Sequence, residues 1–310
     1  MLESVQKTAE QIKRLEVQGA RNVAIAAIKA IQTLSEETKA KNKQQLLKEL
    51  SAAKEMLFAS RETEPLMRNA LRFLLARTEE SKEERIKALT KIVSTASQQF
   101  LDMLEDTKEK IAEIGAKRIR DNAVILTHCH SSTVTYLLKK ARQEGKSFEV
   151  ICTETRPVFQ GRITAREMLD LGVKTTLIVD SAARHFMNRV DLVIVGCDAI
   201  TSEGNVINKI GTSMIALAAQ EARTPFYAVS ELLKFDPATM YGDYERIEER
   251  GSNEIWNKPP KKLIVRNPAF DVTRRDFIHG IICEEGIISP HSIIEVMHRK
   301  YPWAFNQPVS

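Results

Sequence analysis

The stretch that decides the fold is residues 123–132, which read AVILTHCHSS. Four apolar residues are followed by a mostly polar run. A helical pattern comes next, with apolar residues at Val134, Leu137, Leu138 and Ala141. A short apolar run that ends in polar residues and leads into an amphipathic helix is typical of a βαβ unit. The stretch therefore predicts the first strand of a parallel sheet.

The same alternation continues along the chain. We expect further strands at 148–152, 175–179, 192–195 and 226–229. Between them we expect helices at 165–171, 182–187 and 212–222. Short apolar strands that alternate with helices indicate a parallel sheet buried on both faces. After Pro237 the pattern loosens. There we expect strands at 263–265 and 281–283 and a last helix near 291–299.

The first 118 residues have a different texture. They contain one proline, Pro65, and apolar residues recur at spacings of three and four, which is the period of an amphipathic helix. We expect helices around 23–34, 46–57 and 66–76 and a long one over 82–119. The predicted fold class is α/β, with a helical N-terminal domain at 1–118 and a Rossmann-like catalytic domain at 119–310.

Length and composition limit the possible functions. With 310 residues and 43% hydrophobic content, the chain is long enough for about two domains. The net charge of +5 is small and spread along the chain, so we expect no nucleic-acid partner. We see no signal peptide and no apolar run near ~18 residues, which predicts a cytoplasmic protein without membrane contact. Four cysteines without a CxxC pair argue against a zinc site.

Ligands of open parallel sheets bind beyond the carboxyl ends of the strands. Several expected strands are followed directly by polar residues, which are Thr127 to Ser132, Thr153 to Arg156, Asp180-Ser181, Cys197-Asp198, Glu231 and Lys234, while Asn208-Lys209 precede a helix. We expect all of them to converge on one edge of the sheet. Such an edge suits a small phosphorylated ligand.

The residues around Cys129 allow two interpretations each. Ser131, Ser132 and Thr133 begin a helix, where backbone N–H groups bind phosphate, but Ser and Thr are also ordinary helix caps. The chain has neither a GxGxxG nor a P-loop motif. A thiol near a helix N-terminus has a lowered pKa and becomes a usable base or nucleophile. The alternative for Cys129 is a small, packed apolar residue.

Asp198 follows an apolar run and is a candidate general acid or base, or else part of an Asx turn or a helix cap. Single basic residues lie in turn-like contexts at Arg156, Arg162, Lys209 and Lys234. Each alone is more often a surface charge. Gathered at one sheet edge, they would suit a sugar with one or two phosphates.

A series of motifs extends this reading, namely 127–131 (THCHS), 154–165 (ETRPVFQGRITA), 179–185 (VDSAARH), 196–198 (GCD), 208–212 (NKIGT), 235–237 (FDP) and 267–273 (NPAFDVT). Together they resemble the superfamily that joins translation initiation factor 2B regulatory subunits to sugar-phosphate isomerases. The resemblance covers nearly the whole chain. Within the superfamily it is nearest to archaeal ribose-1,5-bisphosphate isomerase, with methylthioribose-1-phosphate isomerase a more distant relative.

The resemblance implies an aldose–ketose isomerase that converts ribose 1,5-bisphosphate to ribulose 1,5-bisphosphate without a metal or other cofactor, in the degradation of nucleoside monophosphates such as AMP. The family's catalytic residues match Cys129, which as thiolate would take the C2 proton, and Asp198, which would move the oxygen protons. The substrate contacts carried over, with Arg156 added from its position, are Gly19, Ala20, Arg21, Arg61, Ser131, Ser132, Thr133, Arg156, Asn208, Lys209 and Lys234.

Three departures from the family pattern touch phosphate binding more than proton transfer. The turn at 19–22 reads Gly-Ala-Arg-Asn instead of Gly-Ala-Gly-Arg, Glu62 and Glu64 follow Arg61, and Ser132 stands where the isomerases tend to carry Lys. They leave room for a shifted substrate or for a regulatory subunit that binds initiation factor 2. The resemblance also implies a homo-oligomer built from dimers, often a hexamer, and activation by a nucleoside monophosphate.

Overall fold

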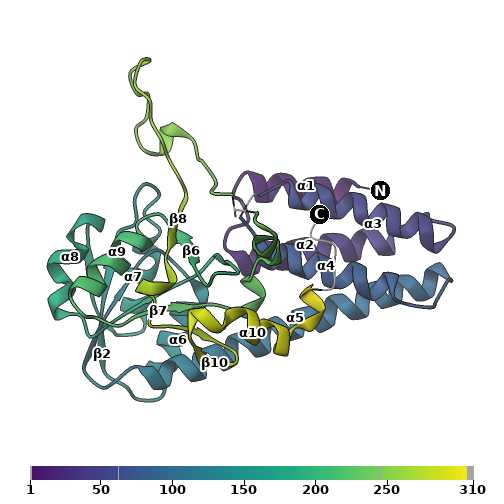
Figure 1. Ribbon diagram of the computed structural model, residues 1–310. Coiled ribbons are helices and arrows are strands. Elements are labelled where there is room, and N and C mark those ends of the chain that lie inside the picture. The colour runs from purple at the N-terminus through teal and green to yellow at the C-terminus, as the bar shows by residue number, and fades with distance from the viewer. Residues whose placement is uncertain (1, 62, 244–245, 306–310) are drawn as a thin grey trace. The chain divides into compact units, whose positions relative to one another are not determined.

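The computed structural model describes residues 2–61, 63–243 and 246–305 (Figure 1). Its contacts divide the chain into two compact units. The first combines residues 1–106 with the later segments 233–245 and 297–310, and the second combines 107–232 with 246–296. The expected boundary between two domains at residue 118 stays a prediction.

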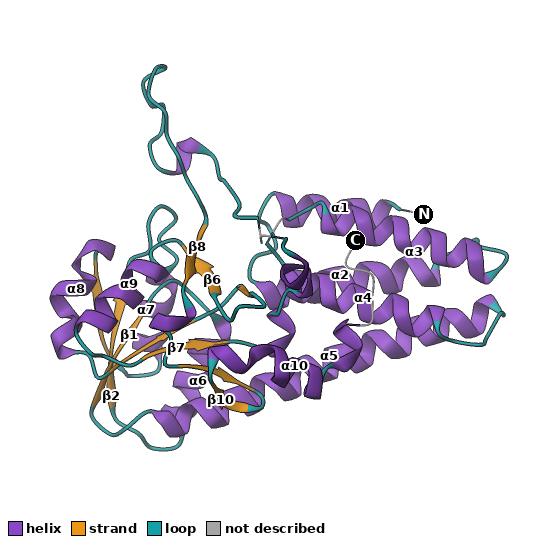
Figure 2. Cartoon of the chain, in the orientation of Figure 1, coloured by secondary structure: helices purple, strands orange, loops and turns teal. Residues whose placement is uncertain are grey.

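The first unit is helical, as its apolar periodicity predicts (Figure 2). Its helices are α1 (Glu3–Lys13), α2 (Ala20–Glu36), α3 (Lys43–Phe58), α4 (Pro65–Glu79) and the first part of α5 (Ile86–Arg118). Local chemistry explains two of the helix starts. The Asn42 side chain accepts a hydrogen bond from the Gln45 backbone N–H, which caps α3, and Pro65 occupies the first position of α4, where its missing N–H costs nothing.

The second unit is a seven-stranded sheet in the order β10-β9-β7-β4-β1-β2-β3. The parallel strands are β1 (Ala123–Thr127), β2 (Phe148–Thr153), β3 (Lys174–Ile178), β4 (Leu192–Val195), β7 (Phe226–Val229) and β9 (Gly280–Cys283). The edge strand β10 (Gly286–Ile288) is antiparallel. The α/β fold class predicted from the sequence is confirmed.

Helices connect these strands. They are α6 (Ser132–Gln143), α7 (Gly161–Asp170), α8 (Ala183–Phe186) and α9 (Thr212–Glu221), and α10 (Ile293–Lys300) follows the sheet. The last turns of α5 and the inner faces of α6 and α7 pack with the central strands into one core, in which Leu137, Val150, Met168 and Ile194 are fully buried. This core holds the carboxyl ends of β1, β2 and β4 in register.

Two features differ from the expectations. A second, antiparallel sheet was not expected, and it consists of β5 (Ala199–Ile200), β6 (Val206–Lys209) and β8 (Phe270–Thr273). The strand expected at 263–265 is wrong: these residues are irregular and belong to an arm (246–268) that projects beyond the sheets of its unit (Figure 1). Leu263 is 48% and Ile264 86% exposed, so this apolar run has neither a partner strand nor a core to cover.

Candidate active site

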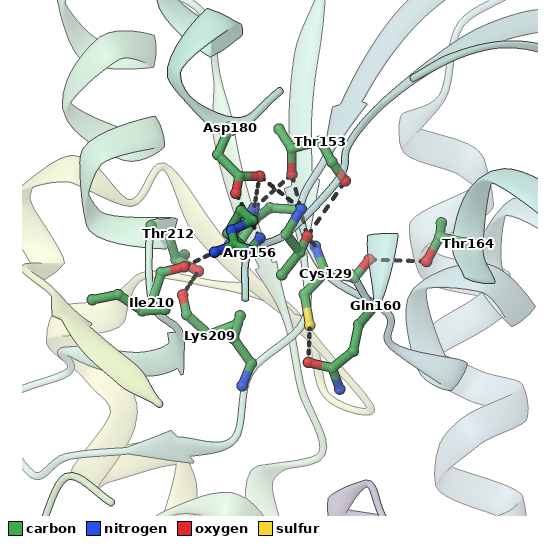
Figure 3. Close-up of polar contacts among 12 residues, drawn as sticks. Cys129, Thr153, Arg156, Gln160, Thr164, Asp180, Lys209, Ile210 and Thr212 are labelled. Atoms are coloured by element: carbon green, nitrogen blue, oxygen red, sulfur yellow. Dashed lines mark hydrogen bonds and ion pairs between the residues drawn. The ribbon is translucent and has the colours of Figure 1, made fainter. Parts of the chain in front are cut away.

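The carboxyl ends of β1, β2 and β3 are joined by hydrogen bonds around Cys129 (Figure 3). The Cys129 backbone N–H donates to Thr155 Oγ1 at 2.9 Å. The backbone N–H groups of Thr155 and Arg156 donate to the two carboxylate oxygens of Asp180, each at 2.7 Å. Polar residues that follow three different strands therefore meet at one edge, as expected for a parallel sheet.

Two residues of this network have unusual backbone angles. Cys129 has φ = 69° and Thr155 has φ = 64°, both in the left-handed region that residues with a side chain rarely adopt. Besides the Cys129–Thr155 bond, the hydroxyl of Thr164 donates to the Cys129 carbonyl at 2.9 Å. Strained backbone that is held by surrounding hydrogen bonds is typical of functional sites.

The sequence assigns His128 no role beyond its place after the strand, yet it is central to the network. Its Nε2 lies 2.9 Å from the Ile210 carbonyl and its Nδ1 lies 2.6 Å from Thr153 Oγ1. Because a carbonyl only accepts, Nε2 carries the hydrogen and Nδ1 accepts from the Thr153 hydroxyl. Burial lowers the pKa of His128, since a charged ring would lose its hydration. His128 is thus a neutral link between the sheet and the turn before α9.

The Cys129 thiol is 8% exposed and lies 3.5 Å from Gln160 Oε1. Burial raises the pKa of Cys129 to about 11, Lys209 lowers it, and the carboxylates of Asp198 and Asp180 raise it. The expectation of a lowered pKa is wrong, because the thiolate loses more hydration than nearby positive charge returns. At neutral pH the resting sulfur therefore carries a proton.

The start of α6 is occupied by its own cap. Ser131 Oγ accepts from the Val134 backbone N–H at 3.4 Å, so this residue serves as a helix cap in the structure. Ser132 is exposed. Thr133 is buried, and its hydroxyl donates to Glu231 Oε1 at 3.4 Å. A phosphate role of these residues stays a prediction.

Two further predicted residues, Asn208 in β6 and Asp198 after β4, lie near this edge. Asn208 donates to Thr212 Oγ1 at 2.9 Å. A Cβ on Gly196 would lie 2.7 Å from the Ser131 Cβ and 3.7 Å from Asn208 Oδ1, so glycine allows the end of β4 to approach both. Asp198 is near enough for its charge to act on Cys129, and its backbone N–H donates to the Ile207 carbonyl at 2.8 Å.

Lys209 is a buried cation. It is 5% exposed, and its Nζ lies 4.9 Å from the centre of the Phe270 ring. Within the described part of the chain, Nζ donates no hydrogen bond and has no carboxylate within 4.0 Å. Burying a charge without a counter-ion is costly. An anionic ligand would remove that cost. Among the predicted residues of the second unit, Lys209 is therefore the most direct candidate for binding phosphate.

Arg156 is placed differently from the expectation of a substrate contact. Its guanidinium donates to the Ile255 carbonyl in the arm at 3.0 Å and lies 5.1 Å from the centre of the Phe159 ring. The residue is exposed. Its backbone N–H contributes to the network through Asp180, while its side chain holds the arm.

Five predicted substrate contacts belong to the first unit. Gly19 precedes α2 with φ = 83°, and Ala20 begins that helix. Arg21 Nη1 donates to the Leu104 carbonyl and Nη2 lies 2.7 Å from Glu105 Oε1. Arg61 Nη1 lies 2.9 Å from Glu64 Oε1. Lys234 is buried.

Two glutamates that follow Arg61 would repel phosphate if they faced it, but Glu64 pairs with Arg61, which offsets part of its charge. Glu62 lies outside the described residues. Among the described residues, no three His, Cys, Asp or Glu side chains gather as metal ligands. No described helix is long and apolar enough to cross a membrane.

The fold defines an α/β protein that combines a helical unit with a mainly parallel sheet. Comparison with known proteins gives its family. The chain belongs to the initiation factor 2 subunit family, whose model matches residues 16–290. It is 41% identical to the ribose 1,5-bisphosphate isomerase of Pyrococcus furiosus, and the match covers 98% of this chain and 96% of that protein.

Two solved structures from Pyrococcus horikoshii are also similar. Translation initiation factor eIF-2B has a TM-score of 0.81 and 32% identity, with 94% of this chain and 98% of that chain covered. 5-Methylthioribose 1-phosphate isomerase has a TM-score of 0.78 and 29% identity, with 95% and 87% covered.

Proposed function

We propose that this protein is a sugar-phosphate isomerase that converts ribose 1,5-bisphosphate to ribulose 1,5-bisphosphate. The names of its relatives support the substrate. The observation that carries the proposal is the electrostatic cluster of Cys129, Asp198 and Lys209 at one sheet edge. The cluster contains two groups that can exchange protons, Cys129 and Asp198, and the buried positive charge of Lys209.

The two proton carriers are sufficient for the reaction. Asp198 gives a proton to the ring oxygen, and the bond from that oxygen to C1 breaks. The Cys129 thiolate takes the proton from C2, which leaves an enediol-like phosphate with a C1–C2 double bond. Asp198 then takes the proton of the C2 hydroxyl while Cys129 returns its proton to C1. The ketone forms at C2, and both residues regain their starting states.

The raised pKa of Cys129 is compatible with this sequence. A thiol beside a carboxylate holds the same single proton as a thiolate beside a carboxylic acid, so one transfer prepares the pair. Lys209 favours the thiolate, because its charge lowers the pKa of Cys129. The thiol needs no outside base.

The phosphate groups need cationic and N–H partners. We propose that Lys209, Asn208 and the start of α6 at 131–133 bind one phosphate, which the buried charge of Lys209 supports. Arg21, Arg61 and Lys234, with the turn at 19–20, are proposed contacts as well. Arg21 and Arg61 already have carboxylate neighbours, so phosphate would share them with Glu105 and Glu64.

The proposed setting is carried over from the family resemblance of the sequence motifs. We propose a cytoplasmic homo-oligomer built from dimers, up to a hexamer, that acts in AMP degradation. Ribulose-bisphosphate carboxylase would consume the product.

Incubating the purified protein with ribose 1,5-bisphosphate, coupled to that carboxylase, tests the proposal. Turnover should fall by roughly 10³-fold or more in Cys129→Ser and in Asp198→Asn. Matched controls are Cys283→Ser, whose thiol donates to the Gly286 carbonyl, and Asp276→Asn, whose carboxylate pairs with Arg274. Both should keep full activity. Unchanged turnover in Cys129→Ser or Asp198→Asn contradicts the mechanism.

The family and the eIF-2B structure favour a second candidate, a regulatory subunit that binds initiation factor 2. A pull-down of purified initiation factor 2 with this protein distinguishes the two. Binding without any turnover of ribose 1,5-bisphosphate would support the regulatory subunit over the enzyme.

A further inference from the structure

Lys209 is the last residue of β6, and the turn that follows it, residues 210–213, begins α9. Hydrogen bonds hold this turn from two sides. His128 Nε2–H donates to the Ile210 carbonyl at 2.9 Å. On the other side, the Asp271 carboxylate accepts from the backbone N–H of Gly211 at 2.8 Å and from that of Ser213 at 3.1 Å.

Packing makes the same connection. Gly211 has φ = 103°, and a Cβ there would lie 3.2 Å from the His128 ring, so the ring rests directly on the turn. In the ladder between β6 and β8, Lys209 pairs with Phe270, whose ring lies under the ammonium group. Asn208 pairs with Asp271. The position of Lys209 therefore depends on β1 through His128 and on β8 through Asp271.

We propose that His128 and Asp271 are positioning residues, which hold the turn at 210–213 so that Lys209 stays beside the Cys129 thiol. Neither side chain takes or gives a proton in the reaction. The importance of this positioning for turnover rests on the proposed isomerase function, but its effect on the thiol does not.

The charges around Cys129 show why the position of Lys209 matters. Lys209 is the cation that favours the thiolate, whereas Asp198 and Asp180 disfavour it. The His130 ring is directed to α7, with Nδ1 3.1 Å from Thr164 Oγ1 and Nε2 3.7 Å from Glu167. If the turn moved, Lys209 would offset less of the rise in the Cys129 pKa that burial and the two carboxylates cause. The thiolate would then form only at higher pH.

Asp271 must be ionised to accept both N–H groups fully. Burial raises the pKa of Asp271 to about 6, although the N–H groups of Gly211 and Ser213 lower it. The carboxylate therefore holds the turn above about pH 6 and loses part of its hold as the pH falls below that value. This gives Asp271→Asn, which keeps the size of the side chain, a clear meaning as a test.

The thiol itself reports the effect. The rate of alkylation of Cys129 is measured from pH 7 to 9 on the full chain, and mass spectrometry of the Cys129 peptide separates it from Cys152, Cys197 and Cys283. Below the thiol pKa this rate is proportional to the fraction of thiolate. The ratio of the rates with anionic iodoacetate and neutral iodoacetamide separates a lost positive charge from a change in exposure, because exposure changes both rates and the Lys209 charge favours the anion. Lys209→Met sets the scale for a lost ammonium group.

We expect His128→Leu and Asp271→Asn to slow alkylation by iodoacetamide as Lys209→Met does, by roughly tenfold at a given pH, which corresponds to a rise of about one unit in the thiol pKa. The ratio of the iodoacetate rate to the iodoacetamide rate should fall with it. His128→Gln keeps a donor near the Ile210 carbonyl and should restore most of the loss. Asp276→Asn, on the surface near β8, should leave both rates unchanged. A structural role alone would lower the melting temperature without lowering this ratio.

The proposal is overturned if Lys209→Met lowers the alkylation rate and the ratio while His128→Leu and Asp271→Asn leave both unchanged. If His128→Leu does not fold, Asp271→Asn decides alone. If the rates change as expected but the wild-type protein does not turn over ribose 1,5-bisphosphate, the positioning stands and the proposed function fails.

Discussion

The segment before α4 and the end of β6 each bury a basic side chain, but they surround it differently. In the first unit the Arg61 side chain is 10% exposed and lies 2.9 Å from Glu64, whose side chain is 2% exposed. In the second unit Lys209 is also buried, but among the described residues its ammonium group has no carboxylate within 4.0 Å; it lies 4.9 Å from the centre of the Phe270 ring, and its charge acts on Cys129.

The difference separates a structural charge from a functional one. A buried ion pair compensates its own desolvation, and breaking it is strongly destabilising. A buried ammonium group without a carboxylate costs stability until an anion arrives. Lys209 therefore has charge available for a ligand and for the thiol, whereas Arg61 must share its charge with Glu64.

Replacing Lys209 gives the largest expected effect. Lys209→Met should lower kcat/KM for ribose 1,5-bisphosphate by about 10³-fold, because both phosphate binding and thiolate formation lose their cation. The melting temperature should not fall, since a desolvated charge is removed. Lys174→Met, which removes an exposed lysine paired with Glu149, is the control and should change neither quantity. A stability loss in Lys209→Met would mean that its charge is compensated in the folded protein.

Breaking the ion pair of α4 should have the opposite profile. Glu64→Gln should lower the free energy of unfolding by about 3 kcal/mol, because Arg61 remains buried beside a neutral amide. Urea unfolding measures this loss. The Glu105 side chain, which pairs with Arg21, is 63% exposed. Glu105→Gln should therefore lower the free energy of unfolding by less than about 1 kcal/mol. Equal losses in the two variants would remove the distinction between them.

Inorganic phosphate should act mainly on the end of β6, because Arg61 already pairs with Glu64. At about ten times its dissociation constant, phosphate should stabilise the wild-type protein by roughly 1.4 kcal/mol, seen as a higher melting temperature. Lys209→Met should show no such rise. Sodium chloride at the same ionic strength is the control for screening, and an equal rise with chloride would argue against a phosphate site.

The smallest expected effect concerns Asp271, whose carboxylate accepts hydrogen bonds from the backbone N–H groups of Gly211 and Ser213. Burial raises the pKa of Asp271 from 3.8 to about 6, so the ionised form is less favourable in the folded protein than in the unfolded chain. Its contribution to stability should therefore fall by roughly 1 kcal/mol as the pH rises from 4 to 6. The difference in stability between the wild type and Asp271→Asn should show this slope, and a constant difference would contradict the raised pKa.

The sequence predicted the large sheet better than the small one. The strands at 192–195 and 226–229 are found at the predicted residues, because continuous apolar runs between polar residues are typical of strands buried on both faces. Strands β5 and β8 have two and four residues, too few to show a period. The helix expected at 182–187 is present as α8, with 3-10 turns before and after it.

The site was predicted in its members more than in its chemistry. Polar residues after the strands were expected to converge, and hydrogen bonds do join Cys129, Thr155 and Asp180, whereas the Arg156 side chain contacts the arm. His128 was missed, although it stands between the apolar strand and Cys129. Its partners Thr153 and Ile210 lie 25 and 82 residues away in the chain, so no local pattern could indicate its role.

By itself, the sequence determined the fold class and the family, because alternating apolar runs and short motifs are properties of neighbouring residues. Tertiary structure alone decided that the thiol is protonated at rest, that Arg61 has a carboxylate partner and that Lys209 has none among the residues the structure describes. Hydration and Coulomb energy depend on which distant groups surround a side chain, and the order of residues does not contain that information directly.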